Sequence, residues 1–513
     1  MILRVICLYL LLIFYCQPVF SEQNGQIKNV ILFIGDGMHL EHEIAASLYL
    51  TGENTSLAWH KFPYVAFVST WDVDTYNEYA KKLNQKPFNY NKFYATTGYD
   101  PDEGGFMPSP LQKNINKEYF LPDSKNAKKG ERIELATDSA AAATAMATGL
   151  KTTKGNISWL ADDMPKGNIK TIMELVREKK GASIGVITTA PFNHATPAAF
   201  VAHNKDRNNY YTGLNDNNEL GIADEIIKIT KPDVVIGGGH PKFTSKLFYK
   251  QERYLNKELY KQLKSSNEYV FVERKPWKQA KESLLNASKL ASDKNLKLFG
   301  LYGGPFGYYE FPKPLNKPAN PKIIQNKENP SLADSVIAGL NALSQNDKGF
   351  FLMAEQGTID IANHLNNYKA MIGTVADLNE AVKAAIYFVD KPNDNINWDN
   401  TLLIVTSDHA NSYMRIKKPE KLCKGCLPKQ RNFIKKSVYP GEEIEYGSDW
   451  HTNELVCIYV KGNKLDYFKE AEVLWYPGAK IIDNTMIFDV LNRALGLEYN
   501  KREVLDAINY IPQ

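Results

Sequence analysis

The sequence predicts an α/β fold: a large, mostly parallel central sheet with helices on both of its faces. Three observations lead to this prediction. Short, uninterrupted apolar runs recur along the chain, as expected for strands that are buried on both faces. Segments with helical periodicity lie between these runs, and that alternation is typical of parallel sheets covered by helices. Finally, 43% of the 513 residues are hydrophobic, which is ample for a large core.

Six apolar runs are interpreted as buried strands, and two periodic segments as helices between strands. The predicted strands span residues 30–34, 183–188, 234–236, 350–353, 402–405 and 455–460, and the predicted helices span 169–179 and 332–343. Two irregular segments, 71–129 and 411–447, look like insertions, and segments of this size usually form lids, interface elements or decorations. No internal repeat or long Gly/Ser linker divides the sequence, so we expect residues 22–513 to form a single domain.

The N-terminus has the pattern of a secretory signal peptide. Arg4 precedes an apolar run over residues 5–15, and Val19 and Ser21 suit the two positions that a signal peptidase reads before Glu22. The run is short for a membrane span. We therefore expect residues 1–21 to be removed and the mature chain to be exported, to the periplasm or the medium. The C-terminus has no apolar tail for a lipid anchor, so we expect no stable membrane anchor.

Charge and cysteine usage narrow the function classes. The 62 basic and 58 acidic residues give a formal net charge of +4, without a basic patch interleaved with aromatic residues, so nucleic-acid binding is not expected. Cys423 and Cys426 form a C-x-x-C pair in a polar, lysine-rich segment, for which a local disulfide is expected in an exported chain. Cys457 lies in an apolar run and is expected to be a buried free thiol.

Carboxylates and imidazoles gather at the ends of the predicted strands. Because open α/β sheets bind ligands just beyond the carboxyl ends of their strands, we expect these side chains to meet. The mixture of imidazole and carboxylate suits zinc, and the carboxylates can also hold magnesium. The candidate ligands in these segments are Asp36, Glu355, Asp360, His364, Asp408, His409 and His451.

An alanine-rich helix is predicted to begin at Asp138 or Ser139 and to end at Gly149. The free N–H groups and the dipole at such a helix start favour an anion. Taken alone, Asp138 or Ser139 is most simply an N-cap. A serine hydroxyl becomes a nucleophile when something withdraws its proton, and a neighbouring zinc ion would do so. The helix start and the metal ligands would then form one site.

Together these segments resemble the alkaline phosphatase family. The sequence DSA at 138–140, followed by TAMATG at 144–149, resembles the nucleophile segment of that family. The sequence FLMAEQGTIDIANH at 351–364 resembles its glutamate–aspartate–histidine segment, with matching offsets. Asp36, the pair Asp408 and His409, and His451 match the remaining metal segments in order. The similarity spans residues 29–462, apart from the two insertions.

The resemblance implies hydrolysis of small-molecule phosphate monoesters through a covalent phosphoserine at Ser139. It also implies a phosphate-binding Arg207 that Asp138 orients, two zinc ions and one magnesium ion. The implied ligand sets are Asp360, His364 and His451 for one zinc; Asp36, Asp408, His409 and Ser139 for the second; and Asp36, Glu355 and Thr196, beside His194, for the magnesium.

Two positions depart from the usual pattern of the family. His194 stands where many bacterial members have aspartate, which leaves the third metal open between magnesium, zinc and cobalt. Ile361 stands where relatives often have lysine or histidine, so one polar contact to phosphate or to its water shell is expected to be lost. Two other functions stay open: a phosphodiesterase or nucleotide pyrophosphatase of the same superfamily, and a non-catalytic, metal-stabilised surface protein. Family members are commonly homodimers, and a homodimer is an open alternative to a monomer here.

Overall fold

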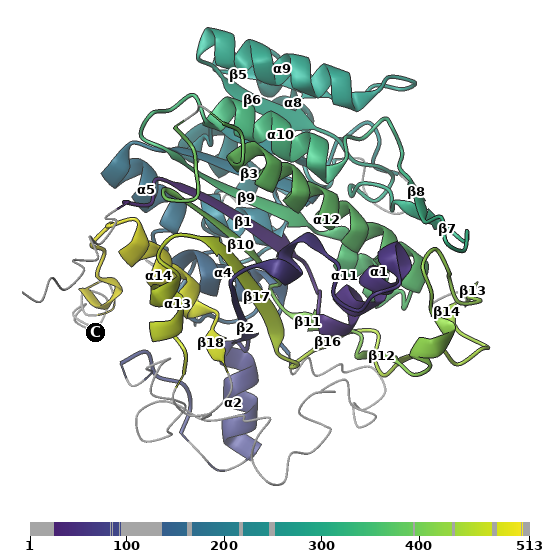
Figure 1. Ribbon diagram of the computed structural model, residues 1–513. Coiled ribbons are helices and arrows are strands. Elements are labelled where there is room, and N and C mark those ends of the chain that lie inside the picture. The colour runs from purple at the N-terminus through teal and green to yellow at the C-terminus, as the bar shows by residue number, and fades with distance from the viewer. Residues whose placement is uncertain are drawn as a thin grey trace, which may run out of the picture.

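The computed structural model describes residues 25–82, 84, 86–91, 93, 136–161, 167–214, 219–245, 252–392, 395–432, 437–473, 480–503 and 505. The predicted signal peptide, residues 1–21, lies outside these ranges. The centre is a ten-stranded sheet with the strand order β18-β2-β17-β10-β1-β9-β3-β4-β6-β5 (Figure 1). Its strands are β1 (Asn29–Gly35), β2 (Tyr64–Ser69), β3 (Ser183–Pro191), β4 (Val234–Gly238), β5 (Tyr269–Glu273), β6 (Lys297–Leu301), β9 (Phe350–Gln356), β10 (Thr401–Thr406), β17 (Val456–Gly462) and β18 (Ile481–Asp483).

All six predicted strands are present, with ends that shift by a few residues. Strand β1 pairs in parallel with both β9 and β10, at the centre of the sheet. Strand β17 is antiparallel to both of its neighbours, β10 and β2. The other pairs in the sheet are parallel. The start of β17 therefore lies at the same edge as the carboxyl ends of the parallel strands.

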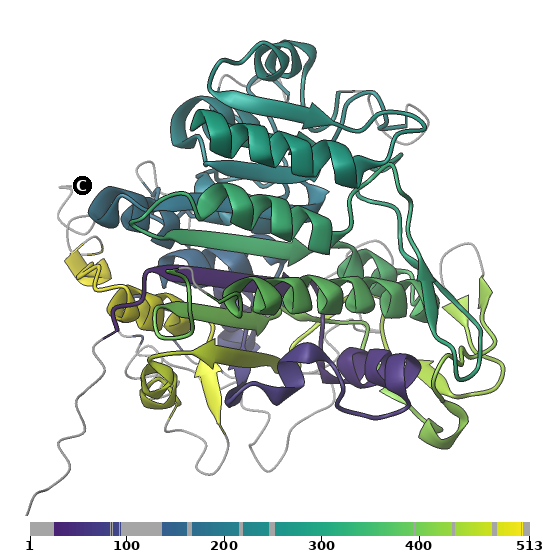
Figure 2. The same ribbon diagram turned by 45° about the horizontal axis from the view of Figure 1, so that its top comes forward.

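Helices cover both faces of the sheet, as Figures 1 and 2 show. Alternate side chains of β1 point to opposite faces and enter two separate apolar cores, with Phe33 in one and Leu32 in the other. The core around Phe33 includes α1 (Leu40–Thr51), α9 (Ala280–Lys294), α10 (Leu332–Leu343), α11 (Thr358–His364) and α12 (Tyr368–Val389). The core around Leu32 includes α4 (Ser139–Thr148), α5 (Ile172–Lys180), α6 (Ala195–Val201), α7 (Ile222–Glu225), α8 (Lys257–Lys264), α13 (Leu465–Glu470) and α14 (Thr485–Ala494). The predicted fold class is confirmed.

The two predicted helices form, and their caps fix their ends. Helix α10 spans the predicted residues, Leu332–Leu343. Helix α5 begins at Ile172, three residues later than predicted, because Thr171 caps it. The Thr171 side chain accepts from the backbone N–H of Glu174, and the Glu174 carboxylate accepts from the N–H of Thr171. Such a reciprocal pair satisfies two N–H groups that a helix start would otherwise leave unpaired.

The described parts of the two predicted insertions contain more secondary structure than their sequences suggested. Segment 71–129 was expected to be irregular, but it opens with helix α2 (Val73–Lys82). The buried positions Val73, Tyr76 and Ala80 have helical spacing, and this short pattern was overlooked. Residues 94–129 lie outside the described ranges. Segment 411–447 contains short paired strands, β12 (Met414–Ile416) with β15 (Ile444–Tyr446) and β13 (Arg431–Asn432) with β14 (Ser437–Val438). A further pair, β7 (Lys313–Leu315) with β8 (Lys322–Ile324), lies outside it.

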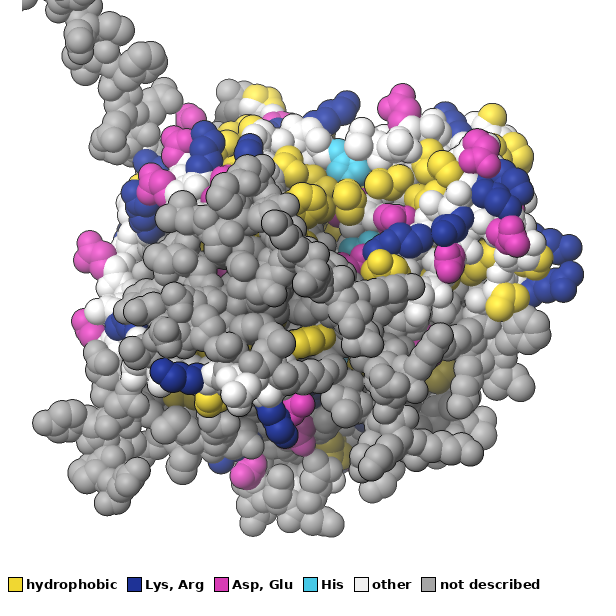
Figure 3. All heavy atoms as spheres, turned by 90° about the horizontal axis from the view of Figure 1, so that it is seen from below, with side chains coloured by type: hydrophobic (Ala, Val, Ile, Leu, Met, Phe, Trp, Pro, Cys, Tyr) yellow, Lys and Arg dark blue, Asp and Glu magenta, His cyan; other side chains and the backbone are white. Residues whose placement is uncertain are grey.

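The cysteines are arranged as predicted. Cys423 and Cys426 are joined by a disulfide, and Cys457 is a buried free thiol. The described helices include none with the length and apolar character that a membrane crossing requires. On the described part of the face in Figure 3, basic and acidic side chains are interspersed among apolar ones.

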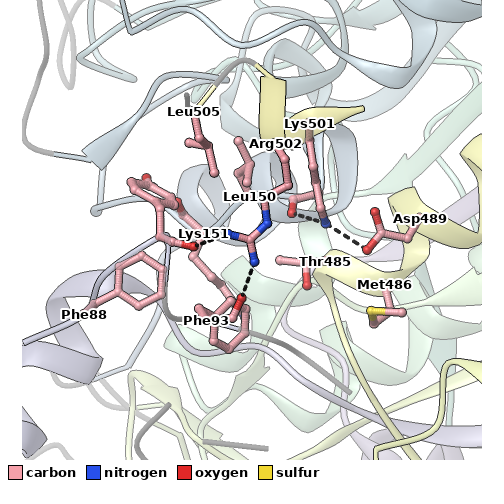
Figure 4. Close-up of a pocket in the computed structure, with 12 residues that line it drawn as sticks. Phe88, Phe93, Leu150, Lys151, Thr485, Met486, Asp489, Lys501, Arg502 and Leu505 are labelled. Carbon is pink, nitrogen blue, oxygen red and sulfur yellow. Dashed lines mark hydrogen bonds and ion pairs between the residues drawn. The ribbon is translucent and has the colours of Figure 1, made fainter. Parts of the chain in front are cut away.

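A pocket of about 230 Å³ lies at the C-terminal end of α4, beside the segment that follows α2 (Figure 4). Its apolar walls include Phe93. Its basic groups bind backbone carbonyls: Lys501 donates to Gly149, and Arg502 donates to Tyr90 and Phe93. At this pocket, hydrogen bonds from the C-terminal segment therefore hold both the residues that follow α2 and the end of α4.

Candidate active site

The carboxyl edge of the sheet brings the predicted ligands together. Asp36 follows β1, Glu355 is the last residue but one of β9, and the pair Asp408 and His409 follows β10. His451 precedes the antiparallel β17 and reaches the same edge through β16 (His451–Thr452), which pairs with β11 (Ala410–Asn411). Three groups of donor atoms each lie within 4.8 Å of one another: Asp360, His409 and His451; Asp36, Asp408 and His409; and Asp36, His194 and Glu355.

The first group is organised around Asp360. The predicted ligand His364 is not one of the three residues of this group, but it lies one turn after Asp360 in α11, with its Nε2 3.1 Å from Asp360 Oδ2. His451 Nε2 is 3.5 Å from Asp360 Oδ1. Both imidazoles donate from Nδ1 to a backbone carbonyl, His364 to Asp449 at 2.8 Å and His451 to Thr137 at 2.7 Å. Each Nε2 therefore presents a lone pair to the group, which is the usual arrangement of metal-binding histidines.

The second group surrounds the hydroxyl of Ser139. Ser139 Oγ lies 3.2 Å from His409 Nε2. The same nitrogen is 3.4 Å from Asp36 Oδ1 and 3.2 Å from Asp408 Oδ2. Both of these carboxylate oxygens are buried, and neither accepts a hydrogen bond within the described part of the chain. Buried oxygens of this kind need a partner that the described residues do not supply, and the arrangement of Asp36, Asp408, His409 and Ser139 fits a metal ion in that place.

The third group combines carboxylates, a hydroxyl and His194. Glu355 accepts a hydrogen bond from Thr188, and Thr196, in the first turn of α6, is fully buried. His194 is the N-cap residue of α6, and its Nδ1 has no hydrogen-bond partner among the described residues. Its Nε2 is 3.0 Å from the hydroxyl of Tyr308. Oxygen donors dominate this group, as magnesium prefers.

The electrostatics of these groups also calls for cations. Burial, followed by the charge of Asp408, raises the pKa of Asp36 well above its usual value. Burial likewise raises the pKa of Glu355 to about 7 and that of Asp408 to about 6. Burial acts on Asp360 in the same direction, but the nearby imidazoles outweigh it, and its pKa is lowered. Burial lowers the pKa of His409 and keeps it in the neutral form that binds metals.

Arg207 is held at the N-terminus of α4. Asp138 is the N-cap of this helix, and its Oδ1 accepts from the N–H of Ala141. Its Oδ2 accepts from the N–H of Gly155 at 3.0 Å and from Arg207 Nη1 at 2.8 Å. Arg207 Nη2 is 3.4 Å from His194 Nε2. A guanidinium thus lies at a helix start, where both features attract an anion with several oxygens.

Sequence reasoning missed three positions at this site. Asn411, assigned to an insertion, donates to Asp360 Oδ1 at 2.5 Å, and its place three residues after Asp408 was a usable signal. Gly37 has a φ of +67°, and a Cβ there would lie 2.7 Å from Asp360 Oδ1. Tyr308 belongs to the segment after β6, and no motif marks it. Ile361 is half-buried in α11.

The sequence of this chain is similar to those of known alkaline phosphatases. The family model described as alkaline phosphatase matches residues 107–425. Alkaline phosphatase 4 of Bacillus subtilis is 34% identical over 277 residues, which cover 53% of this chain and 49% of the relative. Alkaline phosphatase H of Pseudomonas aeruginosa is 31% identical over 410 residues, covering 75% of this chain and 76% of the relative. The chain thus spans about half the length of the first relative and about three quarters of the second.

Solved structures show a similar fold. The alkaline phosphatase of the Antarctic bacterium TAB5 superimposes with a TM-score of 0.55 at 20% identity, over 92% of this chain and all of that one. The Thermus thermophilus alkaline phosphatase gives a TM-score of 0.57 at 21% identity, over 94% of this chain and 96% of that one. These similarities concern the fold, whereas the family match and the sequence relatives establish descent. The chain belongs to the alkaline phosphatase family.

Proposed function

We propose that this protein hydrolyses phosphate monoesters and releases inorganic phosphate through a covalent phosphoserine at Ser139. The observation that carries this proposal is the position of Ser139 Oγ, 3.2 Å from His409 Nε2 at the start of α4. A hydroxyl there lies beside donors suited to a metal ion and at a helix end that attracts phosphate. Membership of the alkaline phosphatase family supports the same activity.

The proposed metal assignment uses the ligand sets that the family resemblance implies, and it differs from the first donor group in taking His364 in place of His409. Zinc would bind Asp360, His364 and His451, a second zinc would bind Asp36, Asp408, His409 and Ser139, and magnesium would bind Asp36, Glu355 and Thr196 beside His194. When bound, the zinc pair would lower the pKa of the Ser139 hydroxyl and of the hydrolytic water, and would neutralise charge on the phosphate oxygens. A TAB5 alkaline phosphatase variant with glutamate in place of a histidine holds Mg in its M3 site, which supports magnesium in this family.

The chain's own residues then have separate roles. Arg207 donates hydrogen bonds to two oxygens of the phosphate, and Asp138 holds the guanidinium in place by accepting a hydrogen bond from its Nη1. Deprotonated Ser139 attacks phosphorus in line, and the bond to the leaving oxygen breaks as the Ser139–phosphorus bond forms. The leaving alkoxide takes a proton from solvent and departs as the alcohol. A water molecule then attacks the phosphoserine from the side that the alcohol has left and gives up a proton, and the bond between phosphorus and Ser139 Oγ breaks as the new phosphorus–oxygen bond forms. Ser139 recovers its proton, and inorganic phosphate leaves.

The nucleophile assignment is tested with Ser139→Ala in zinc-loaded protein. We expect turnover of an aryl phosphate to fall roughly a thousand-fold or more, because loss of a nucleophile leaves only the binding and electrostatic contributions. Ser283→Ala, on the exposed surface of α9, is the matched control and should retain full activity. Turnover by Ser139→Ala within a few-fold of wild type would contradict the assignment.

The alternative functions are separated by substrate. A monoester carries a dianionic phosphate that Arg207 and the third metal group would both bind, so kcat/KM should be higher for a monoester than for a matched diester. The reverse preference would indicate a phosphodiesterase. If zinc-loaded protein hydrolysed neither substrate at any pH, a non-catalytic surface protein would be the better interpretation.

We also propose that residues 1–21 form a signal peptide and that the single domain 22–513 acts in the periplasm or the medium. N-terminal sequencing of the protein recovered from these compartments tests the cleavage after Ser21. Light scattering on the same material distinguishes a homodimer from a monomer. These assignments rest on the sequence pattern and on family membership.

A further inference from the structure

A histidine outside the metal groups is held between two glutamates. His203 follows α6, and its side chain is only 10% exposed. Its Nδ1 is 2.7 Å from Glu225 Oε1, at the end of α7. Its Nε2 is 3.3 Å from Glu174 Oε2, in the first turn of α5, and 3.0 Å from the carbonyl of Ile169. The imidazole therefore joins three separate segments.

The partners of His203 fix its protonation state. Both ring nitrogens face only oxygen acceptors: Glu225 at Nδ1, and Glu174 and the carbonyl of Ile169 at Nε2. An imidazole satisfies acceptors on both nitrogens only when both carry a proton, which makes it a cation. Burial lowers the pKa of His203, but the hydrogen bonds and charges of the two glutamates outweigh it and raise this pKa to about 10. The same contact lowers the pKa of Glu174.

The same stretch of chain carries three residues of the proposed site. Helix α6 begins with His194 and Thr196 at the third donor group, His203 follows its end, and Arg207 lies four residues further on. The N–H of His203 donates to Glu225 Oε2 at 2.9 Å, so backbone and side chain are both anchored to α7. His203 is thus an anchor between the third donor group and Arg207.

The segment from His203 to Arg207 is short, and backbone hydrogen bonds hold it at Asn204 and Arg207. Asn204 exchanges two backbone hydrogen bonds with Ile157, each 2.8 Å long. The N–H of Arg207 donates to the carbonyl of Gly155 at 2.8 Å, and Gly155 in turn donates to Asp138. Because this segment has few rotatable bonds that are free to adjust, a displacement of His203 should also displace the backbone of Arg207.

From this connection we propose that His203, as a cation clamped between Glu174 and Glu225, is a positioning residue for the phosphate-binding Arg207. His203 does not touch the phosphate. Its charge-assisted contacts hold the 202–207 segment against α5 and α7, so that the guanidinium is in place before substrate arrives. This inference rests on the proposed function, because it assumes that Arg207 binds phosphate.

The test measures inorganic phosphate binding by calorimetry on the zinc-loaded full chain. His203→Gln keeps the size of the side chain but removes the charge and one of the two donors. We expect its phosphate dissociation constant to rise about tenfold, because a small misplacement of a positioned group has a large effect. His203→Lys, which restores a cation, should recover part of the loss. His60→Gln is the matched control, because His60 is also a buried partner of a glutamate, with Nε2 2.9 Å from Glu43, and should leave phosphate binding unchanged.

A double-mutant cycle separates positioning from general loosening. If His203 acts through Arg207, His203→Gln should change phosphate affinity less than about twofold in an Arg207→Ala background. An equal loss in both backgrounds, or no loss in the wild-type background, would overturn the inference. If His203→Gln does not fold, Glu225→Gln makes the same test by removing one side of the clamp. Absence of hydrolysis by the wild-type protein would instead overturn the proposed function, and phosphate binding would still decide the role of His203.

Discussion

Replacing Gly37 with alanine adds one methyl group and tests the proposed zinc site around Asp360. Gly37 follows Asp36 with a φ of +67°, in the left-handed region that favours glycine. A Cβ at this position would lie 2.7 Å from Asp360 Oδ1 and 3.2 Å from the Cβ of Asn411. Gly37→Ala therefore combines backbone strain with a direct push on a proposed zinc ligand.

The two effects have different magnitudes and different targets. The backbone strain costs roughly 1 kcal/mol of unfolding free energy. To move from 2.7 Å to an ordinary van der Waals distance of about 3.4 Å, Asp360 Oδ1 must retreat by roughly 0.7 Å. Metal–ligand distances tolerate about 0.2 Å, so the site around Asp360 should lose zinc affinity by about 10- to 100-fold. The group around Asp408 should be affected less, although the N–H of Gly37 donates to Asp408 Oδ1.

Competition with a chromogenic zinc chelator measures both zinc dissociation constants, and denaturant unfolding of the metal-free protein measures the strain. Gly213→Ala is the matched control: Gly213 has a φ of +85°, and nothing lies within 4 Å of its added Cβ. It should show the strain alone, with zinc binding intact. If Gly37→Ala bound zinc as tightly as Gly213→Ala, the assignment of Asp360 as a zinc ligand would be refuted.

Three further predictions concern charge in the interior. Burial raises the pKa of Glu355 to about 7 and that of Asp408 to about 6, so at these two groups the metal-free fold binds more protons than the unfolded chain. The stability of the metal-free protein should therefore fall as pH rises from about 4 to 7, and loading with both zinc and magnesium should remove this slope in thermal melts. Lys151 is fully buried, 3.0 Å from Asp483, so Lys151→Met should cost about 3–5 kcal/mol in denaturant unfolding, and Lys151→Met with Asp483→Asn should cost less. Because its pKa is raised in the fold, protonated His203 stabilises the protein fully below about pH 6.5, and this stabilisation is lost as pH rises through about 10. In thermal melts between these pH values, the melting temperature of His203→Gln should therefore fall less steeply with pH than that of the wild type.

Much of the fold and the site could be predicted because local pattern and topology agree here. The buried central strands read as continuous apolar runs, and parallel strands end at one edge, so Asp36, Asp408 and the residues after β9 had to converge. His451 is instructive because it precedes its strand. It joins the others only because β17 is antiparallel, a property that the sequence of the strand does not encode.

Contacts across long sequence separations could not be predicted. Tyr308 reaches His194 from a segment 114 residues away, and His203, in the segment after α6, meets Glu174 of α5. Neither residue lies in a periodic pattern, and a lone histidine or tyrosine is ordinarily a structural residue. Asn411 was easier to recognise, because it is a polar residue that closely follows the motif Asp408–His409. Its partner is Asp360. Such partners are defined by the folded edge of the sheet rather than by their own neighbours in sequence.

The start of α4 shows how the structure resolves what the local sequence leaves open. From the sequence, either Asp138 or Ser139 can be the N-cap of this helix, but a helix has only one N-cap residue. Asp138 takes that position, with Oδ1 on the N–H of Ala141 and Oδ2 on Arg207. Ser139 is thereby the first helical residue, and its hydroxyl is not needed for capping. It lies instead 3.2 Å from His409 Nε2, which is the position that the proposed role as nucleophile needs. One carboxylate thus caps the helix and orients the arginine, and so leaves the serine available for chemistry.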